Sequence, residues 1–192
     1  HSFEIHSSNA RGLGTLKTSG YLSGTAGGII TLSGTVSVAD DLAGTTDANS
    51  DSIDRGDLQG NGTIALTTHS GGADTVVNDE DANFGASTVG GALSATATTG
   101  NITQSGALAI TGVTTIAADS GNNITLTNTS NNFQAAVSIT SGNNVTLVDA
   151  NAIDLGASTV SGTYAVTATA GGSITDSGVL AITGTSTFRI YR

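Results

Sequence analysis

Two groups of acidic residues have the types and spacing that a binding or catalytic site requires. The first group carries oxygen ligands at roughly alternate positions, as a calcium-binding loop does. Its members are Asp47, Asn49, Asp51, Asp54 and Asp57. Ser52 stands where such loops have a central glycine, and Leu58 stands where they end on an acid. The alternatives are therefore a calcium site and a solvated acidic loop that holds no ion.

The second group is the pair Asp154 and Asp176, which occupy matching places in two copies of an internal repeat. Carboxylates stacked on neighbouring strands would lie about 5 Å apart. That distance suits a shared proton, a bound cation or the two acids of a retaining glycosidase. A glycosidase also needs a sugar-binding cleft, and only Tyr164 and Phe188 could supply aromatic rings nearby. We therefore predict no catalytic residues, no resident cofactor and no metal beyond this calcium hypothesis.

Charge excludes two classes of partner. The net charge is −10, with five basic and fifteen acidic residues, and no Lys or Arg lies between Arg55 and Arg189. Phosphate backbones and anionic membranes need clustered cations, so we expect neither nucleic acid nor a membrane surface as partner. No apolar run approaches the roughly 20 residues that span a bilayer, so we expect no membrane insertion.

The composition also restricts the fold. Aromatic residues make up 4% of the chain, Trp, Met, Cys and Pro are absent, and Gly reaches 27. β-Branched residues interrupted by Gly, Asn and Asp favour short strands joined by tight turns. Only 10% of the residues are charged, whereas a soluble helical domain needs charges on its wet face. We therefore expect an all-β protein.

Internal repeats organise the elements that must position these acids. Residues 85–89 recur at 156–160, and residues 102–112 recur with two changes at 174–184. Coils that start at Gly85, Gly106, Gln134, Gly156 and Gly178 are 21, 28, 22 and 22 residues long. The 28-residue coil would carry its extra residues in a bulging turn at 127–132. A repeat of about 21–22 residues predicts a right-handed parallel β-helix (β-solenoid) with three short strands per coil.

Three apolar columns follow from this register, because side chains alternate along a strand and like residues stack on like. The columns are Val89–Ile110–Ile139–Val160–Ile182, Ala95–Ile116–Val145–Val166–Phe188 and Ile102–Ile124–Ile153–Ile174. One observation conflicts with them. Residues 120–126 match residues 141–147 at an offset of 21, and the columns do not stack these segments. Either the same turn serves two corners, or the register is wrong for one coil.

A polar column is expected two residues before each coil start. It consists of Asn83, Gln104, Asn132, Asp154 and Asp176. Stacked amides can hydrogen-bond along the solenoid axis, so we interpret this column first as a structural ladder. Residues 85–192 form the regular β-helix in this interpretation, and residues 1–84 form an irregular N-terminal part of the solenoid with acidic loops. A separate N-terminal domain is the alternative.

Residues 132–162, which include the phrase Ser141-Gly-Asn-Asn-Val-Thr-Leu147, resemble the repeats of filamentous-haemagglutinin-like bacterial exoproteins. The resemblance covers residues 83–188. It implies a right-handed β-helix, export, and adhesion or scaffolding at the cell surface. The secretion domain of such exoproteins carries Asn-Pro motifs, which cannot occur in a segment without Pro.

From the residues and the resemblance together we expect a non-catalytic structural or adhesive segment of a large secreted or cell-surface protein. A host surface or a glycan is the expected ligand, and open strand edges favour end-to-end self-association. Two alternatives remain: a carbohydrate-active β-helix, such as a polysaccharide lyase or glycoside hydrolase, and an ice-binding solenoid. Thr125-Leu-Thr127 and Thr167-Ala-Thr169 suit ice binding, but the expected register places them on different sides.

Overall fold

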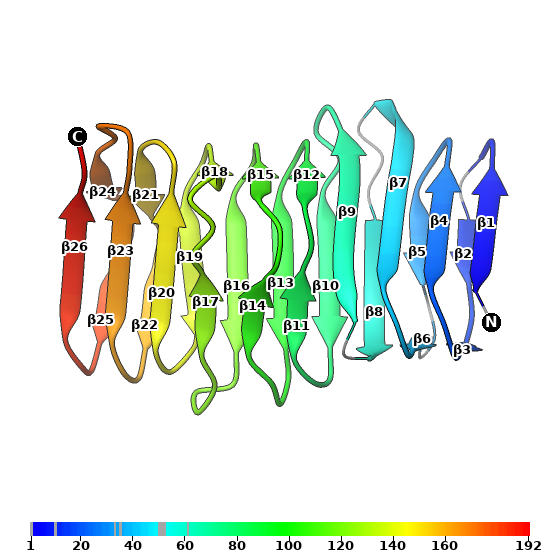
Figure 1. Ribbon diagram of the computed structural model, residues 1–192, viewed down its shortest axis with the longest axis horizontal. Helices are drawn as coiled ribbons and strands as arrows, with labels where there is room; N and C mark the ends of the chain where they lie inside the picture. The colour runs from blue at the N-terminus through cyan, green and yellow to red at the C-terminus, as the bar shows by residue number, and fades with distance from the viewer. Residues whose placement is uncertain (1, 10, 33, 35, 50–52, 61) are drawn as a thin grey trace.

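The chain is a parallel β-solenoid of about eight turns with about 21 residues per turn, as predicted (Figure 1). The computed structural model describes residues 2–9, 11–32, 34, 36–49, 53–60 and 62–192. All strand pairs within this part are parallel, and its regular structure is β-strand throughout. No helix in this part of the chain is long and apolar enough to cross a membrane.

One long sheet, here called the first sheet, runs the length of the solenoid. Its strands are, in spatial order, β1 (Phe3–Ser7), β4 (Leu22–Ala26), β7 (Leu42–Asn49), β9 (Thr63–His69), β11 (Ala82–Phe84), β14 (Ile102–Gln104), β17 (Ile124–Leu126), β20 (Val145–Asp149), β23 (Tyr164–Ala168) and β26 (Ser186–Ile190). Three short strands extend it beside β9: β12 (Ser87–Val89), β15 (Leu108–Ile110) and β18 (Asn132–Phe133).

The second sheet closes the opposite side of the solenoid. Its strands are β2 (Arg11–Leu13), β5 (Ile30–Leu32), β8 (Ile53–Gln59), β10 (Asp74–Asn78), β13 (Leu93–Ala97), β16 (Thr114–Ala118), β19 (Val137–Ser141), β21 (Ile153–Leu155) and β24 (Ile174–Asp176). It is joined through β8 by β3 (Leu16–Thr18) and β6 (Val36–Val38). The last two strands, β22 (Ser158–Val160) and β25 (Leu180–Ile182), pair with each other beyond β21 and β24.

Each coil has a straight side and, in most coils, a bent side. A straight side is one longer strand, such as β9 or β20, whereas a bent side is two three-residue strands separated by a turn. The bend lies on the second sheet in the first two coils, moves to the first sheet at β11–β12, and returns to the second sheet at β21–β22. Three strands per coil, as predicted, arise wherever one side is bent.

The interior is a continuous stack of aliphatic side chains. Within strands such as β13, β16 and β23, buried residues alternate strictly with partly exposed ones. Ile110, Ile139 and Val160 are 1% exposed or less, and Ile182 is partly buried against the same core. Thr111 and Thr183, one residue further along, are exposed. The inward and outward assignment from the sequence is therefore confirmed at these positions.

The predicted register is correct on either side of one coil and wrong across it. Val89 pairs with Ile110, and Val160 with Ile182, as expected. Ile139, however, pairs with Ile116 instead of lying between Ile110 and Val160. Ile110 stacks on Phe133 in the next coil.

The other two columns break at the same place. Ile124 pairs with Val145 and not with Ile153. Val166 stacks on Leu147 and not on Val145. The 21-residue match between 120–126 and 141–147 is thus a true stack of one coil on the next, and the 28-residue coil does not exist. The alternative that one coil was out of register is the correct one.

The physical reason is that the 71-residue repeat spans about three and a half coils, not three. Strand β10 lies in the second sheet, but β20, its counterpart 71 residues later, lies in the first. The same exchange relates β13 to β23 and β16 to β26, while β11 and β14 of the first sheet correspond to β21 and β24 of the second. Successive repeats are therefore related by a half-turn about the solenoid axis, which exchanges the two sheets.

Candidate functional site

The candidate calcium ligands lie along strands. The backbone of Asp47 and Asn49 belongs to β7, and that of Asp54 and Asp57 belongs to β8. Their side chains and the whole of Asp51 lie outside the described residues. Among the described residues, no group of three or more His, Asp or Glu side chains could hold a metal ion. Calcium binding at 47–57 stays a prediction.

The carboxylates of Asp154 and Asp176 do not stack on each other. Asp154 pairs with Thr175, whose hydroxyl donates to Asp154 Oδ1 at 3.4 Å, while Asp176 pairs with Leu155. One residue of slip places adjacent positions on opposite faces of a strand. Asp154 therefore follows the outward row of β21, and Asp176 takes the inward position at the last coil. The predicted paired-acid site is not present.

The rest of the expected polar column is also out of register. Asn83 pairs with Thr103, Gln104 with Phe84, and Asn132 with Ala109. Gln104 instead forms a two-way amide pair with buried Asn131: each side-chain nitrogen donates to the other's oxygen at 2.8 Å. Asn131 Oδ1 also accepts from the Leu108 N–H at 2.9 Å, so this pair fixes a corner of the first sheet.

A real polar ladder exists at another corner, immediately before the strands of the first sheet. Its members, one per coil, are Asp81, Asn101, Asn123, Asn144 and Thr163. At each step a backbone N–H donates to the side-chain Oδ1 one coil earlier, at 2.6, 2.8, 3.1 and 3.0 Å. Each side chain thus satisfies a turn N–H that has no strand partner. The signal that could have located it was the Ser-Gly-Asn-Asn phrase repeated at an offset of 21.

The duplicated segments 85–89 and 156–160 share one structural role, since each converts a straight side into a bent one. Ser87 Oγ accepts from the Leu66 N–H of straight β9 at 3.1 Å, and Ser158 Oγ accepts from the Ile139 N–H of straight β19 at 3.2 Å. Each hydroxyl also donates, at 3.0 Å, to the carbonyl of the glycine two residues earlier. The serine replaces the ladder hydrogen bonds that the bend removes.

Glycine is required where these bends begin. A Cβ at position 85 would lie 2.5 Å from the Thr63 methyl, and one at position 156 would lie 2.1 Å from Ser138 Oγ. These distances are shorter than any van der Waals contact, so the strand below would have to move. The glycine lets the bent side approach the straight one closely.

Asp149 is an acidic side chain buried at a corner of the second repeat. Its carboxylate accepts from the Phe133 N–H at 2.7 Å and from the Asn151 N–H at 2.6 Å. Burial raises the pKa of Asp149, and these two backbone donors partly oppose the rise. Its counterpart 71 residues earlier is Asn78, which is also buried and carries no charge. The position thus caps a corner and does not require an acid.

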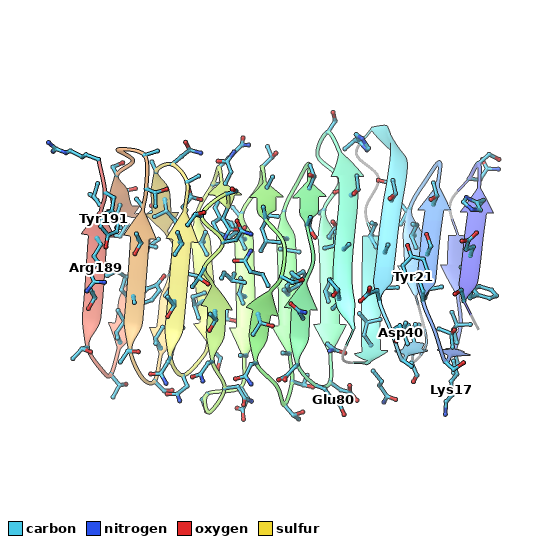
Figure 2. The ribbon with its side chains drawn as sticks, in the orientation of Figure 1. Lys17, Tyr21, Asp40, Glu80, Arg189 and Tyr191 are labelled. Atoms are coloured by element: carbon cyan, nitrogen blue, oxygen red, sulfur yellow. The ribbon has the colours of Figure 1, made fainter. Side chains whose placement is uncertain are left out.

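Charged side chains of the described residues gather at corners and ends instead of on the sheets. Lys17, Asp40 and Glu80 project from one long edge of the N-terminal half, and Arg189 projects from terminal strand β26 (Figure 2). A hollow of about 210 Å³ opens at the C-terminal coil, lined mainly by Leu155, Ile174, Leu180, Phe188 and Ile190. It is apolar apart from Thr175 and Asp176 and therefore resembles an uncovered core more than a catalytic cleft.

Comparison with known proteins places the chain by its repeat alone. The pattern described as "Repeats of unknown function (DUF5649)" matches residues 71–140 and again residues 142–190. The two matches begin 71 residues apart, which is the half-turn repeat of the structure. No curated protein matches the chain. No solved structure matches it either.

Proposed function

The chain belongs to the family of repeats of unknown function (DUF5649), and we propose that it is a non-catalytic, rod-like segment of a large exported protein at the cell surface. One observation carries the proposal: the core runs without a break from coil to coil, while both outer faces consist mainly of small uncharged side chains. Such a solenoid transmits length and presents a repeated surface, which suits scaffolding and adhesion.

The outer faces favour a neutral ligand over a charged one. Outward positions of β13 and β16 are Ser94, Thr96, Thr115 and Ala117, and none of them is charged. Hydroxyl and methyl groups arranged in rows suit a neutral, hydroxylated ligand such as a glycan. The resemblance to filamentous-haemagglutinin-like exoproteins points in the same direction.

A glycan array probed with the fluorescently labelled chain tests this proposal. We expect binding to neutral glycans that changes little with salt, because no charged contact is involved. The same glycans should be recovered intact after long incubation. Release of new reducing ends or of unsaturated sugars would overturn the non-catalytic assignment, and absence of binding to any glycan or host cell would overturn the adhesive one.

Ice binding is the second candidate, favoured by a row of threonines on the first sheet. Thr25 pairs with Thr45, Thr45 with Thr67, and Thr67 with Thr88, so four consecutive coils carry the row. The expectation that Thr125-Leu-Thr127 and Thr167-Ala-Thr169 lie on different sides is wrong, because β17 and β23 both belong to the first sheet. A thermal-hysteresis assay tests this candidate, with Thr45→Lys as the variant that should abolish any activity.

A further inference from the structure

We propose that the C-terminal face of the solenoid, formed by β24, β25 and β26, binds the N-terminal face of a second copy of this chain after a half-turn about the long axis. The partner's β1 then lies on β24 and β25, and its β2 and β3 lie on β26. This inference is independent of the ligand proposed above, since it concerns assembly of the rod and not what the rod binds.

The first support is a covered copy of the same face inside the molecule. The half-turn repeat makes β24, β25 and β26 the counterparts of β14, β15 and β16. The edges of those three strands are covered by β17, β18 and β19 respectively. Among the described residues, β26 pairs only with β23, β24 only with β21, and β25 only with β22. The same surface is thus buried once and open once.

The open face is apolar where the internal one is buried. Phe188 and Ile190 of β26 are 46% and 52% exposed, whereas their counterparts Ile116 and Ala118 in β16 are at most 2% exposed. Beside them lies the apolar hollow of about 210 Å³. At the other end, Phe3 is 43% exposed, and Ile5, on the same face of β1, is partly buried. Unpaired strand edges with exposed apolar residues are the surfaces on which solenoids associate.

The steps at the two ends select the half-turn. The first sheet projects at both ends, because β1 precedes β2 in the chain and β26 follows β24 and β25. Docking β1 directly on β26 would therefore leave the second sheet short of one strand layer. A half-turn places the projecting β1 on the recessed β24 and β25, which closes both sheets. Because the rotation exchanges the two sheets, every new strand pair stays parallel, as in the rest of the solenoid.

The register then predicts which residues meet. In β16 and β19, Thr115 pairs with Ser138. The counterpart of Thr115 is Thr187, and Gly12 occupies the same column as Ser138, so Gly12 of one copy should lie beside Thr187 of the other. Docking without the half-turn would instead place Glu4 beside Arg189. The two arrangements therefore bring different pairs together.

Cysteine cross-linking separates the two arrangements, because the chain has no cysteine of its own. The double variant Gly12→Cys with Thr187→Cys should form disulfide-linked chains of many copies on mild oxidation. A Cβ at Gly12 meets nothing within 4 Å, so the change is tolerated. The matched control is Glu4→Cys with Arg189→Cys. Faster linkage of the control pair, or equal linkage of both, would overturn the half-turn arrangement.

Association itself is tested without cysteines by light scattering over a concentration series. The unmodified chain should form larger species as concentration rises. Ile190→Lys, which places a charge at the docking face, should weaken association by about a hundredfold. Val113→Lys changes a residue that is 47% exposed away from the ends and should leave association unchanged. A chain that stays monomeric at the highest concentration, or equal effects of the two lysines, would overturn the proposal.

Discussion

Replacing the two bend-forming serines by alanine tests the structural role assigned to the duplicated segment. Ser87 and Ser158 are 4% and 3% exposed, and each accepts a backbone N–H from the straight strand below. Alanine keeps the backbone but removes the acceptor, so the N–H groups of Leu66 and Ile139 stay buried without a partner. Leaving a buried donor unsatisfied costs about 1–3 kcal/mol.

The two substitutions should be nearly additive. They lie about three and a half coils apart, which at about 4.8 Å per coil is beyond the distance at which mutations usually couple. We therefore expect each serine variant to lower the free energy of unfolding by about 1–3 kcal/mol and the double variant by about the sum. Thr159→Ala, one residue from Ser158 and exposed, is the control and should change it by about 0.5 kcal/mol or less.

Urea unfolding measures the total effect, and amide hydrogen exchange locates it. The Ile139 amide should exchange faster in Ser158→Ala but not in Ser87→Ala, and the Leu66 amide should behave in the opposite way. Unfolding energies of both serine variants within error of Thr159→Ala would refute the reasoning. So would unchanged exchange at Leu66 and Ile139, because the hydroxyls would then not be the acceptors that close the bend.

Three further predictions concern single side chains. Val160→Asp should lower the free energy of unfolding by several kcal/mol, because it buries an unpaired charge, whereas Thr159→Asp on the outer face should cost far less, as measured by urea unfolding. Burial raises the pKa of Asp149, so folding favours its protonated form; stability should rise on acidification from neutral to about pH 4, and Asp149→Asn should reduce that rise in thermal unfolding. Burial also raises the pKa of Tyr164 from 10.0 to about 12, so its contribution is complete below pH 10 and lost as the pH approaches 12; Tyr164→Phe should reduce this alkaline loss, measured by the same method.

The fold was predictable because its determinants are local. Glycine, asparagine and β-branched residues specify short strands and turns, and the alternation of Ile and Val with Thr and Ser specifies which residues point inward. Ile110 and Thr111 show how sharp that alternation is, since the first is buried and the second exposed. Neither inference requires knowing which coil stacks on which.

The candidate sites failed because stacking is not a local property. An Asp154–Asp176 pair requires both acids to occupy the same column, and their columns differ by one residue. The error began with the assumption that equal segments of a solenoid lie above one another. Gly85 and Gly156 begin equal segments, yet they lie on opposite sides of the coil. Short-range matches, such as 120–126 with 141–147, were the better guide to register.

The half-turn repeat also bears on how this family can bind a ligand. A repeat of three whole coils would present its outer surface on the same face each time, and the rod would have one binding side. With three and a half coils, the outer rows of β10, β13 and β16 face one way, and those of their counterparts β20, β23 and β26 face the other. A surface carried by each repeat is therefore displayed on alternate sides. Since the half-turn docking of whole chains continues the same alternation, a filament of this protein would present equivalent faces to two surfaces at once, which is the geometry of a cross-linking scaffold.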